Sequence, residues 1–190
     1  MSLIEKLNGN KFDIVGDIHG EYEALINLLN HLGYDLNGSH PDNRKLIFVG
    51  DFCDRGNDSP SVILLIKKLI LNKKAQAVLG NHELNLLINS VKSGSGWYFD
   101  EMHSNDLVYE PYKKALSSKE EIYDFLSSLP IVLENENLRI VHAMWDNDSV
   151  EKLKKINDSD IVSSYKKFEA DINDKSIQNN LHQKYKKLVS

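Results

Sequence analysis

Three short polar motifs, each led by glycine and each placed directly after an apolar run, constrain the fold of this chain most. They read GDIHG at residues 16–20, GDFCDRG at residues 50–56 and GNHE at residues 80–83. Asp17, Asp51 and Asn81 follow one another at intervals of 34 and 30 residues. Intervals of this length leave room for a crossover helix between parallel strands. The pattern predicts an α/β fold in which the three motifs meet at the carboxyl edge of a parallel sheet.

Hydrophobic periodicity predicts the elements between and after these motifs. The expected strands cover residues 12–15, 46–49, 77–79, 131–133 and 138–141. The first expected helix begins at Tyr22 and ends near Gly33, the second opens at Ser59-Pro60, and a third covers residues 83–91. A β-sheet core flanked by helices is therefore expected.

The chain is expected to form one domain over residues 1–190. Residues 93–96 (SGSG) are predicted to be a flexible linker that opens a mainly helical insertion, residues 93–128, beside the site. Residues 146–190 form a predicted helical tail with a solvated lysine-rich face. The aromatic run at residues 97–99 favours core packing over base stacking.

Composition narrows the classes of protein that fit. The 190 residues are 41% apolar and carry a formal net charge of −5, so general nucleic-acid binding is not expected. Because Cys53 is the single cysteine, an internal disulfide is excluded, and we expect its thiol to be packed and unreactive. The longest purely apolar run, residues 62–66, is far too short to span a bilayer. We therefore expect a cytoplasmic protein without a membrane partner.

The motif side chains are those that bind metals and phosphates. The motifs present Asp17, His19, Asp51, Asn81 and His82, together with Asp54, beyond the strand ends. Carboxylates, imidazoles and an amide oxygen suit Mn, Fe or Zn. Asp51 has two oxygens and can bridge two ions, which would activate a water as nucleophile. This explains why no serine or cysteine nucleophile motif is evident, and it predicts hydrolysis of a phosphate ester.

The three motifs, with Leu129-Pro130 and the IVHA run at residues 140–143, resemble the signature blocks of the calcineurin-like metallophosphoesterases. The DRG ending at residues 54–56 is similar to the phosphoprotein-phosphatase branch, which includes bacterial serine/threonine phosphatases and symmetrical diadenosine tetraphosphate hydrolases. The resemblance implies the calcineurin-like metallophosphoesterase fold and two divalent cations, with manganese expected to support activity in an assay.

The resemblance also implies a role for each motif residue. Asp17 and His19 would bind the first metal, Asp51 would bridge, and Asn81 and His142 would bind the second metal. The implied catalytic set is His82 as general acid, Asp54 as the carboxylate that orients it, and Arg55 as the phosphate grip.

Two alternatives stay open for these side chains. His82 could bind metal instead of acting as the acid. Asp54 and Arg55 could form a surface ion pair with no catalytic role.

The chain departs from the family pattern in two places. The fourth block continues as His142-Ala143-Met144-Trp145, where the family has small residues, so the substrate side is expected to differ. The resemblance also implies a later histidine for the second metal. Only His182 follows, with no Gly-His pair around it, which predicts a truncated chain with a weakened second site.

We therefore expect a metallophosphoesterase that acts on a phosphorylated protein or a nucleotide. The run at residues 80–87 is similar to the diadenosine tetraphosphate hydrolases and favours a dinucleoside polyphosphate. The alternative is a non-catalytic phosphate-binding or regulatory module without a complete second metal site.

Overall fold

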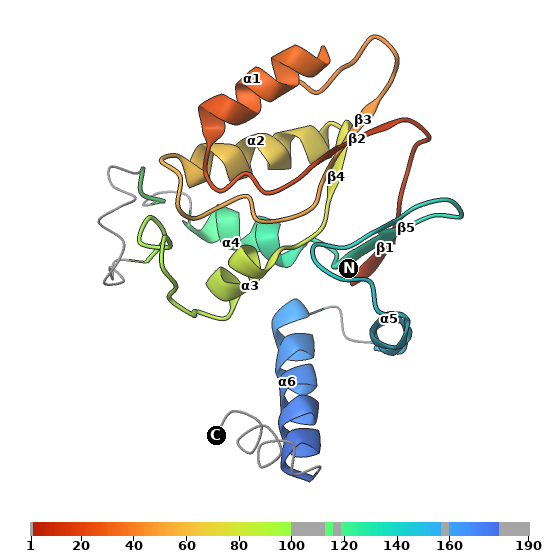
Figure 1. Ribbon diagram of the computed structural model, residues 1–190. Coiled ribbons are helices and arrows are strands. Elements are labelled where there is room, and N and C mark those ends of the chain that lie inside the picture. The colour runs from red at the N-terminus through yellow and green to blue at the C-terminus, as the bar shows by residue number, and fades with distance from the viewer. Residues whose placement is uncertain (1, 100–112, 116–118, 157–159, 179–190) are drawn as a thin grey trace, which may run out of the picture.

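The computed structural model describes residues 2–99, 113–115, 119–156 and 160–178 (Figure 1). The strands are β1 (Ile4–Lys6), β2 (Phe12–Val15), β3 (Lys45–Phe48), β4 (Ala75–Ala77), β5 (Val132–Glu134) and β6 (Arg139–Ile140). The helices are α1 (Tyr22–Leu32), α2 (Ser59–Leu71), α3 (Asn81–Leu87), α4 (Lys119–Ser127), α5 (Asn147–Lys154) and α6 (Ile161–Gln178).

The predicted parallel sheet is confirmed by strands β2, β3 and β4. They pair in that order, and both pairings are parallel. The crossovers between them contain α1 and α2, as the spacing of the motifs predicts. All three strands therefore end at the same edge, which brings the three polar motifs together.

A second sheet has the order β1-β5-β6. Strand β5 runs parallel to β1 and antiparallel to β6, and the turn at residues 135–138 joins the two later strands. The strands expected near residues 131–133 and 138–141 are thus present, but outside the parallel sheet. Strand β1 was not predicted, because its three residues are partly or fully exposed and carry no apolar alternation.

Strand β3 of the parallel sheet packs against a different apolar core on each of its two faces. Leu46 and Phe48 belong to the larger apolar core with α1 and α2, whereas Ile47 packs in a smaller core with Leu133 and Ile140 of the second sheet. Successive side chains of a strand point to opposite faces, so a continuous apolar run is required here. Helices thus lie on one face of the parallel sheet and a second sheet on the other (Figure 1).

Two helix ends follow local sequence signals. The carboxylate of Asp58 accepts a hydrogen bond from the backbone N–H of Ser61 at 3.2 Å and caps α2, with Pro60 in the first turn. Helix α1 ends at Gly33, whose φ of 88° is the left-handed conformation that glycine adopts without strain. These ends lie where the sequence predicted them.

Several predicted boundaries differ from the observed ones. Strand β4 ends at Ala77, two residues before the expected end, because Leu79 N–H turns to the carbonyl of Pro130 at 2.9 Å. Helix α3 begins at Asn81 rather than residue 83, because Glu83 bonds back to the N–H of Gly80 and forms the first turn.

The prediction of a flexible linker at residues 93–96 is wrong. Ser95 is buried, and its hydroxyl donates to the carbonyl of Lys92 at 2.7 Å. The carbonyl of Gly94 accepts from the N–H of Arg55 at 3.2 Å, so this segment packs against the second motif. Gly94 serves close backbone approach rather than flexibility, because a Cβ there would lie 2.8 Å from the backbone nitrogen of Arg55.

The helical expectations for the later chain are met in part. In the insertion, α4 is helical and residues 97–99 form turns, while residues 100–112 and 116–118 lie outside the described residues. The described tail consists of α5 and α6, and α6 extends away from both sheets (Figure 1). Within the described ranges, every helix is too short or too polar to cross a lipid bilayer.

Candidate metal centre

Asp51 lies at the centre of the edge where the strands of the parallel sheet end. Its side chain is buried, and three histidines surround it. The Nε2 atoms of His19 and His82 lie 4.0 and 3.9 Å from Asp51 Oδ2, and Nε2 of His142 lies 3.5 Å from Oδ1. The two oxygens of one carboxylate therefore face two different groups of ligands.

The remaining predicted ligands, Asp17 and Asn81, lie beside these histidines. Asp17 Oδ2 lies 3.9 Å from His19 Nε2, and Asn81 Oδ1 lies 3.0 Å from His142 Nε2. Ligand atoms of Asp17, Asp51 and His142 all lie within 4.8 Å of one another. All five side chains that the sequence predicts as metal ligands therefore gather at one place.

Two of the histidines present Nε2 to the centre because the other ring nitrogen is occupied. Nδ1 of His19 lies 3.0 Å from the carbonyl of Cys53, and Nδ1 of His142 lies 2.8 Å from the carbonyl of Val49. A carbonyl only accepts, so Nδ1 carries a proton in both rings and Nε2 faces the centre. A backbone carbonyl behind the ring is typical of metal-binding histidine.

The donor set fits divalent cations of the Mn, Fe and Zn type. It combines carboxylate oxygens, an amide oxygen and imidazole nitrogens, and it has no thiolate. His19 stands near Oδ2 of Asp51 and His142 near Oδ1, while Asp17 lies close to both histidines and Asn81 lies beside His142. His182, the histidine that follows His142 in the sequence without the expected Gly-His context, lies outside the described residues.

His82 differs from His19 and His142 in its partner. Its Nδ1 lies 2.7 Å from Oδ2 of Asp54, a fully buried carboxylate. The hydrogen bond to Asp54 raises the pKa of His82, which burial and the charge of Arg55 oppose. A carboxylate partner favours the protonated ring, so this geometry suits a proton donor.

The alternative of metal binding by His82 has its own support. His19, Asp51 and His82 form a group whose ligand atoms lie within 4.8 Å of one another.

The carboxylate of Asp54 is held from several directions. The other carboxylate oxygen, Oδ1, accepts a hydrogen bond from Trp97 Nε1 at 2.6 Å. The backbone N–H of Asp54 donates to the hydroxyl of Ser59 at 3.0 Å. Asp54 is fully buried and bonded to His82 and Trp97, so the reading of Asp54 and Arg55 as a surface ion pair is wrong.

Arg55 faces the opening of the centre. Its guanidinium nitrogens lie 3.1 Å from Nε2 of His19 and 3.4 Å from Nε2 of His82. The planar guanidinium therefore spans the side chains of the first and third motifs, where it can meet the oxygens of a phosphate.

Backbone strain concentrates in the loops that build the centre. His19, Asp51, Asp54 and Arg55 have φ between 47° and 69°, a region that non-glycine residues rarely adopt. Each such residue costs on the order of 1 kcal/mol, so the surrounding contacts hold these loops in place. The carbonyl of Asp51 accepts from the N–H groups of both Ile18 and His19, at 2.9 and 3.0 Å, and so ties the first motif to the second.

Glu83 organises the centre, although the sequence analysis gave it no role. It is fully buried, and its Oε2 accepts from the N–H groups of Asp51 and Gly80 at 2.8 and 3.0 Å. Its Oε1 accepts from the N–H of Phe52 at 2.8 Å and of Cys53 at 3.3 Å. Burial raises the pKa of Glu83, whereas these hydrogen bonds favour its ionised form. Its place in the GNHE motif, one step after His82, was the available signal.

Two further sequence predictions concern buried residues. Trp97 is 1% exposed, so core packing is confirmed for its side chain, and its bond to Asp54 adds a link to His82 that the sequence did not indicate. Cys53 is buried, and its thiol donates to Glu83 Oε1 at 3.2 Å. Burial raises the pKa of the Cys53 thiol, which agrees with inert packing.

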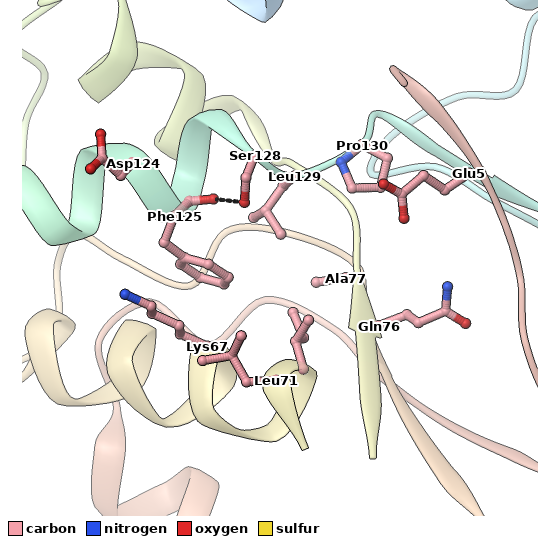
Figure 2. A pocket seen from close by; sticks show the side chains of 11 residues that line it. Glu5, Lys67, Leu71, Gln76, Ala77, Asp124, Phe125, Ser128, Leu129 and Pro130 are labelled. Carbon is pink, nitrogen blue, oxygen red and sulfur yellow. Dashed lines mark hydrogen bonds between the residues drawn. The ribbon is translucent and has the colours of Figure 1, made fainter. Parts of the chain in front are cut away.

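An apolar pocket of about 360 Å³ lies apart from the metal centre, between α2, α4 and β4 (Figure 2). Leu71, Ala77, Phe125 and Leu129 form much of its wall. Lys67, which lines its rim, is paired with Glu121 at 2.8 Å. The pocket contains none of the predicted site residues.

The chain belongs to the calcineurin-like phosphoesterase family, whose model matches residues 11–186. This agrees with the α/β fold and with the order of the motifs around Asp51.

Two similar curated proteins share one name. The chain is 37% identical over 144 residues to bis(5′-nucleosyl)-tetraphosphatase PrpE [asymmetrical] of Oceanobacillus iheyensis, covering 70% of this chain and 56% of the relative. It is 49% identical over 75 residues to the protein of the same name from Halalkalibacterium halodurans, covering 38% of this chain and 30% of the relative. The chain thus spans about half the length of its better-covered relative. The name says asymmetrical, whereas the sequence resemblance extended to symmetrical hydrolases.

Solved structures of the same fold include a provisionally named diadenosine tetraphosphatase. It is 26% identical, with a TM-score of 0.51, covering 78% of this chain and 59% of that one. A cold-active protein-tyrosine phosphatase of a psychrophilic Shewanella species has a TM-score of 0.54 at 19% identity, covering 85% of this chain and 54% of that one. At that identity the likeness shows the fold alone.

Proposed function

We propose that this protein is a metal-dependent phosphoesterase that hydrolyses a phosphate anhydride or ester, with a dinucleoside polyphosphate as the preferred substrate. The arrangement of Asp51 supports this most directly. Its two oxygens face different ligand groups, and a histidine paired to a buried carboxylate stands beside them. Metal ligands, phosphate grip and proton donor thus occupy one opening.

The proposed metal ligands form two sets that share Asp51. Asp17 and His19 would hold the first cation, and Asn81 and His142 would hold the second. Divalent cations bound there would supply Lewis acidity toward phosphate oxygens and toward an attacking water. Among the described residues the second set would offer three protein ligands, Asp51, Asn81 and His142.

The remaining residues bind the substrate and move a proton. Arg55 donates to phosphate oxygens and, with the amide of Asn81, fixes the reacting group. His82, protonated because Asp54 stabilises its imidazolium form, donates the proton on Nε2 to the leaving oxygen. Asp54 acts as a positioning residue, since it holds the ring through Nδ1.

The choice of substrate class draws on the relatives. Curated relatives named bis(5′-nucleosyl)-tetraphosphatase support a dinucleoside polyphosphate. A structural neighbour named as a protein serine/threonine phosphatase is 22% identical and so speaks for the fold only. A phosphorylated protein remains the second substrate class to assay.

Activity with manganese tests the proposal. Purified protein should release phosphate from p-nitrophenyl phosphate and cleave diadenosine tetraphosphate. Asp51→Asn and His82→Ala should each lower kcat by at least about 100-fold, since each removes a group that acts on the reacting phosphate. His31→Gln is the matched control, because His31 lies exposed on α1 away from the motifs. Wild-type levels of activity in His82→Ala and Asp51→Asn would refute the assignment.

A non-catalytic phosphate-binding module is the second candidate. The observation that favours it is the set of only three protein ligands around the second position, without a later histidine among the described residues. Phosphate binding with no turnover of either substrate, in the protein saturated with manganese, would support this candidate over the enzyme.

A further inference from the structure

An exposed apolar and aromatic group follows directly after His142. Met144 is 79% exposed, which is the largest value among the exposed large hydrophobic residues described. The indole of Trp145 is partly exposed, and the guanidinium of Arg139 lies over it, 5.0 Å from the ring centroid. We refer to Arg139, Met144 and Trp145 as the platform.

The ring of the platform is held in place. Trp145 Nε1 donates to Oδ1 of Asn147 at 2.8 Å, in the first turn of α5. That turn is capped by Asp146, which accepts from the N–H of Ser149 at 2.8 Å. A fixed aromatic ring loses little conformational freedom when a planar ligand binds, so it suits recognition.

The platform also lies within chain reach of the metal centre. Met144 and Trp145 follow His142 by two and three residues, which places them at most about 7 and 11 Å along the chain from it. His142 Nε2 in turn contacts Asn81 and Asp51. A ligand whose phosphates sit at the metal centre can therefore extend a planar group to the platform.

The chemistry of the platform matches a nucleobase. Indole rings, guanidinium planes and thioethers all make favourable contacts with flat aromatic ligands. Among the described residues no carboxylate forms an ion pair with Arg139, so its charge is also available to a phosphate. A compact phosphoryl substrate would need none of these three groups.

We infer that the platform binds a base of a nucleotide substrate and so favours nucleotides over compact phosphate esters. This inference rests on the proposed function, since it concerns the substrate of the same site. Trp145 and Met144 are specificity-determining residues that contact the base, and Arg139 is a positioning residue for the ring.

Intrinsic fluorescence tests the inference without any turnover. The chain has two tryptophans, and Trp97 is 1% exposed, so a ligand that stacks on a surface indole reports on Trp145. Adenosine 5′-triphosphate should quench the emission in a saturable way, whereas inorganic tripolyphosphate, which has no base, should not. The same titration of Trp145→Phe should show no saturable quenching. The inference would be overturned if the nucleotide binds at the site, as shown by its displacement by tripolyphosphate, and yet does not quench the wild-type emission.

Kinetics with two substrates give a second readout. Trp145→Ala and Met144→Ala should raise KM for diadenosine tetraphosphate about 5- to 20-fold, with kcat/KM for p-nitrophenyl phosphate within about twofold of wild type. Trp145→Phe should retain most of the affinity, because it keeps an aromatic face. Leu71→Ala is the matched control, since Leu71 is also an exposed apolar residue, at 71% exposure on α2.

The possible failures are distinguishable. Equal losses on both substrates in Trp145→Ala would assign the ring a structural role and overturn the inference. Turnover of the aryl phosphate without any effect of the platform variants would leave the proposed phosphoesterase standing and overturn the platform. Base-dependent quenching without turnover of either substrate would support the platform and refute the proposed enzyme.

Discussion

The buried carboxylate of Glu83 offers a test of how the centre is held together. It accepts four backbone hydrogen bonds, two on each oxygen, from Asp51, Gly80, Phe52 and Cys53. A Glu83→Gln variant has almost the same shape but replaces one accepting oxygen with an NH₂ donor. Two backbone N–H groups then face a donor in a site with no exposure.

The expected cost follows from those two orphaned donors. A buried polar group left without a partner costs about 1–3 kcal/mol, so two of them lower the free energy of unfolding by roughly 4 kcal/mol. For a chain of this length, that corresponds to a melting temperature about 8–16 °C below wild type.

Thermal unfolding followed by circular dichroism measures this loss, with urea unfolding as a second measurement. Glu121→Gln is the matched control, because Glu121 is an exposed carboxylate paired with Lys67, and its replacement should change stability by less than about 1 kcal/mol. A Glu83→Gln protein that melts with the wild type would show that Glu83 does not accept these bonds as a carboxylate, and the reasoning would fail.

Three further outcomes are expected. Asp54→Asn removes the carboxylate that raises the pKa of His82, so the alkaline limb of the pH profile of kcat/KM should move to lower pH. An unchanged alkaline limb would contradict the role of His82 as the general acid. Gly56→Ala would push a methyl group against the backbone carbonyl oxygen of His19 in the first motif. We expect the free energy of unfolding, measured in urea, to fall by about 1–3 kcal/mol, and the metal affinity to fall with it. Arg44 holds the pKa of Asp13 at about 2 instead of its usual 3.8, so this pair stabilises the fold above about pH 4 and the benefit disappears as pH falls toward 2. The melting temperature of Arg44→Ala should therefore lie below that of the wild type at pH 7 and equal it near pH 2. A difference in melting temperature that stays constant across that range would exclude the Arg44–Asp13 pair as the cause.

Hydrophobic periodicity was sufficient to predict the helices and strands that lie next to the motifs. Helix α1 and its end at Gly33, the start of α2 at Ser59, and the parallel sheet all follow from local signals and from the motif spacing. Convergence of Asp17, His19, Asp51 and Asn81 also followed, because consecutive parallel strands end at one edge. His142 follows β6 of the second sheet, so its place was predicted from the family resemblance alone.

The features that sequence reasoning missed depend on tertiary contacts. Strand β1 pairs with β5 more than 120 residues away, and nothing in its three residues signals that partner. The linker reading of residues 93–96 failed because glycine there allows close approach to Arg55, which composition cannot distinguish from flexibility. The roles of Glu83 and Trp97 depend on which buried donors and acceptors meet them, and no periodicity encodes that.

Anomalous scattering from crystals soaked in manganese tests the central claim most directly, because it locates the cations independently of activity. Two peaks about 3.5–4 Å apart, each within coordinating reach of one oxygen of Asp51, are predicted, with His19 beside one and His142 beside the other. A single peak, or peaks that do not share Asp51, would contradict a two-metal centre built on this carboxylate.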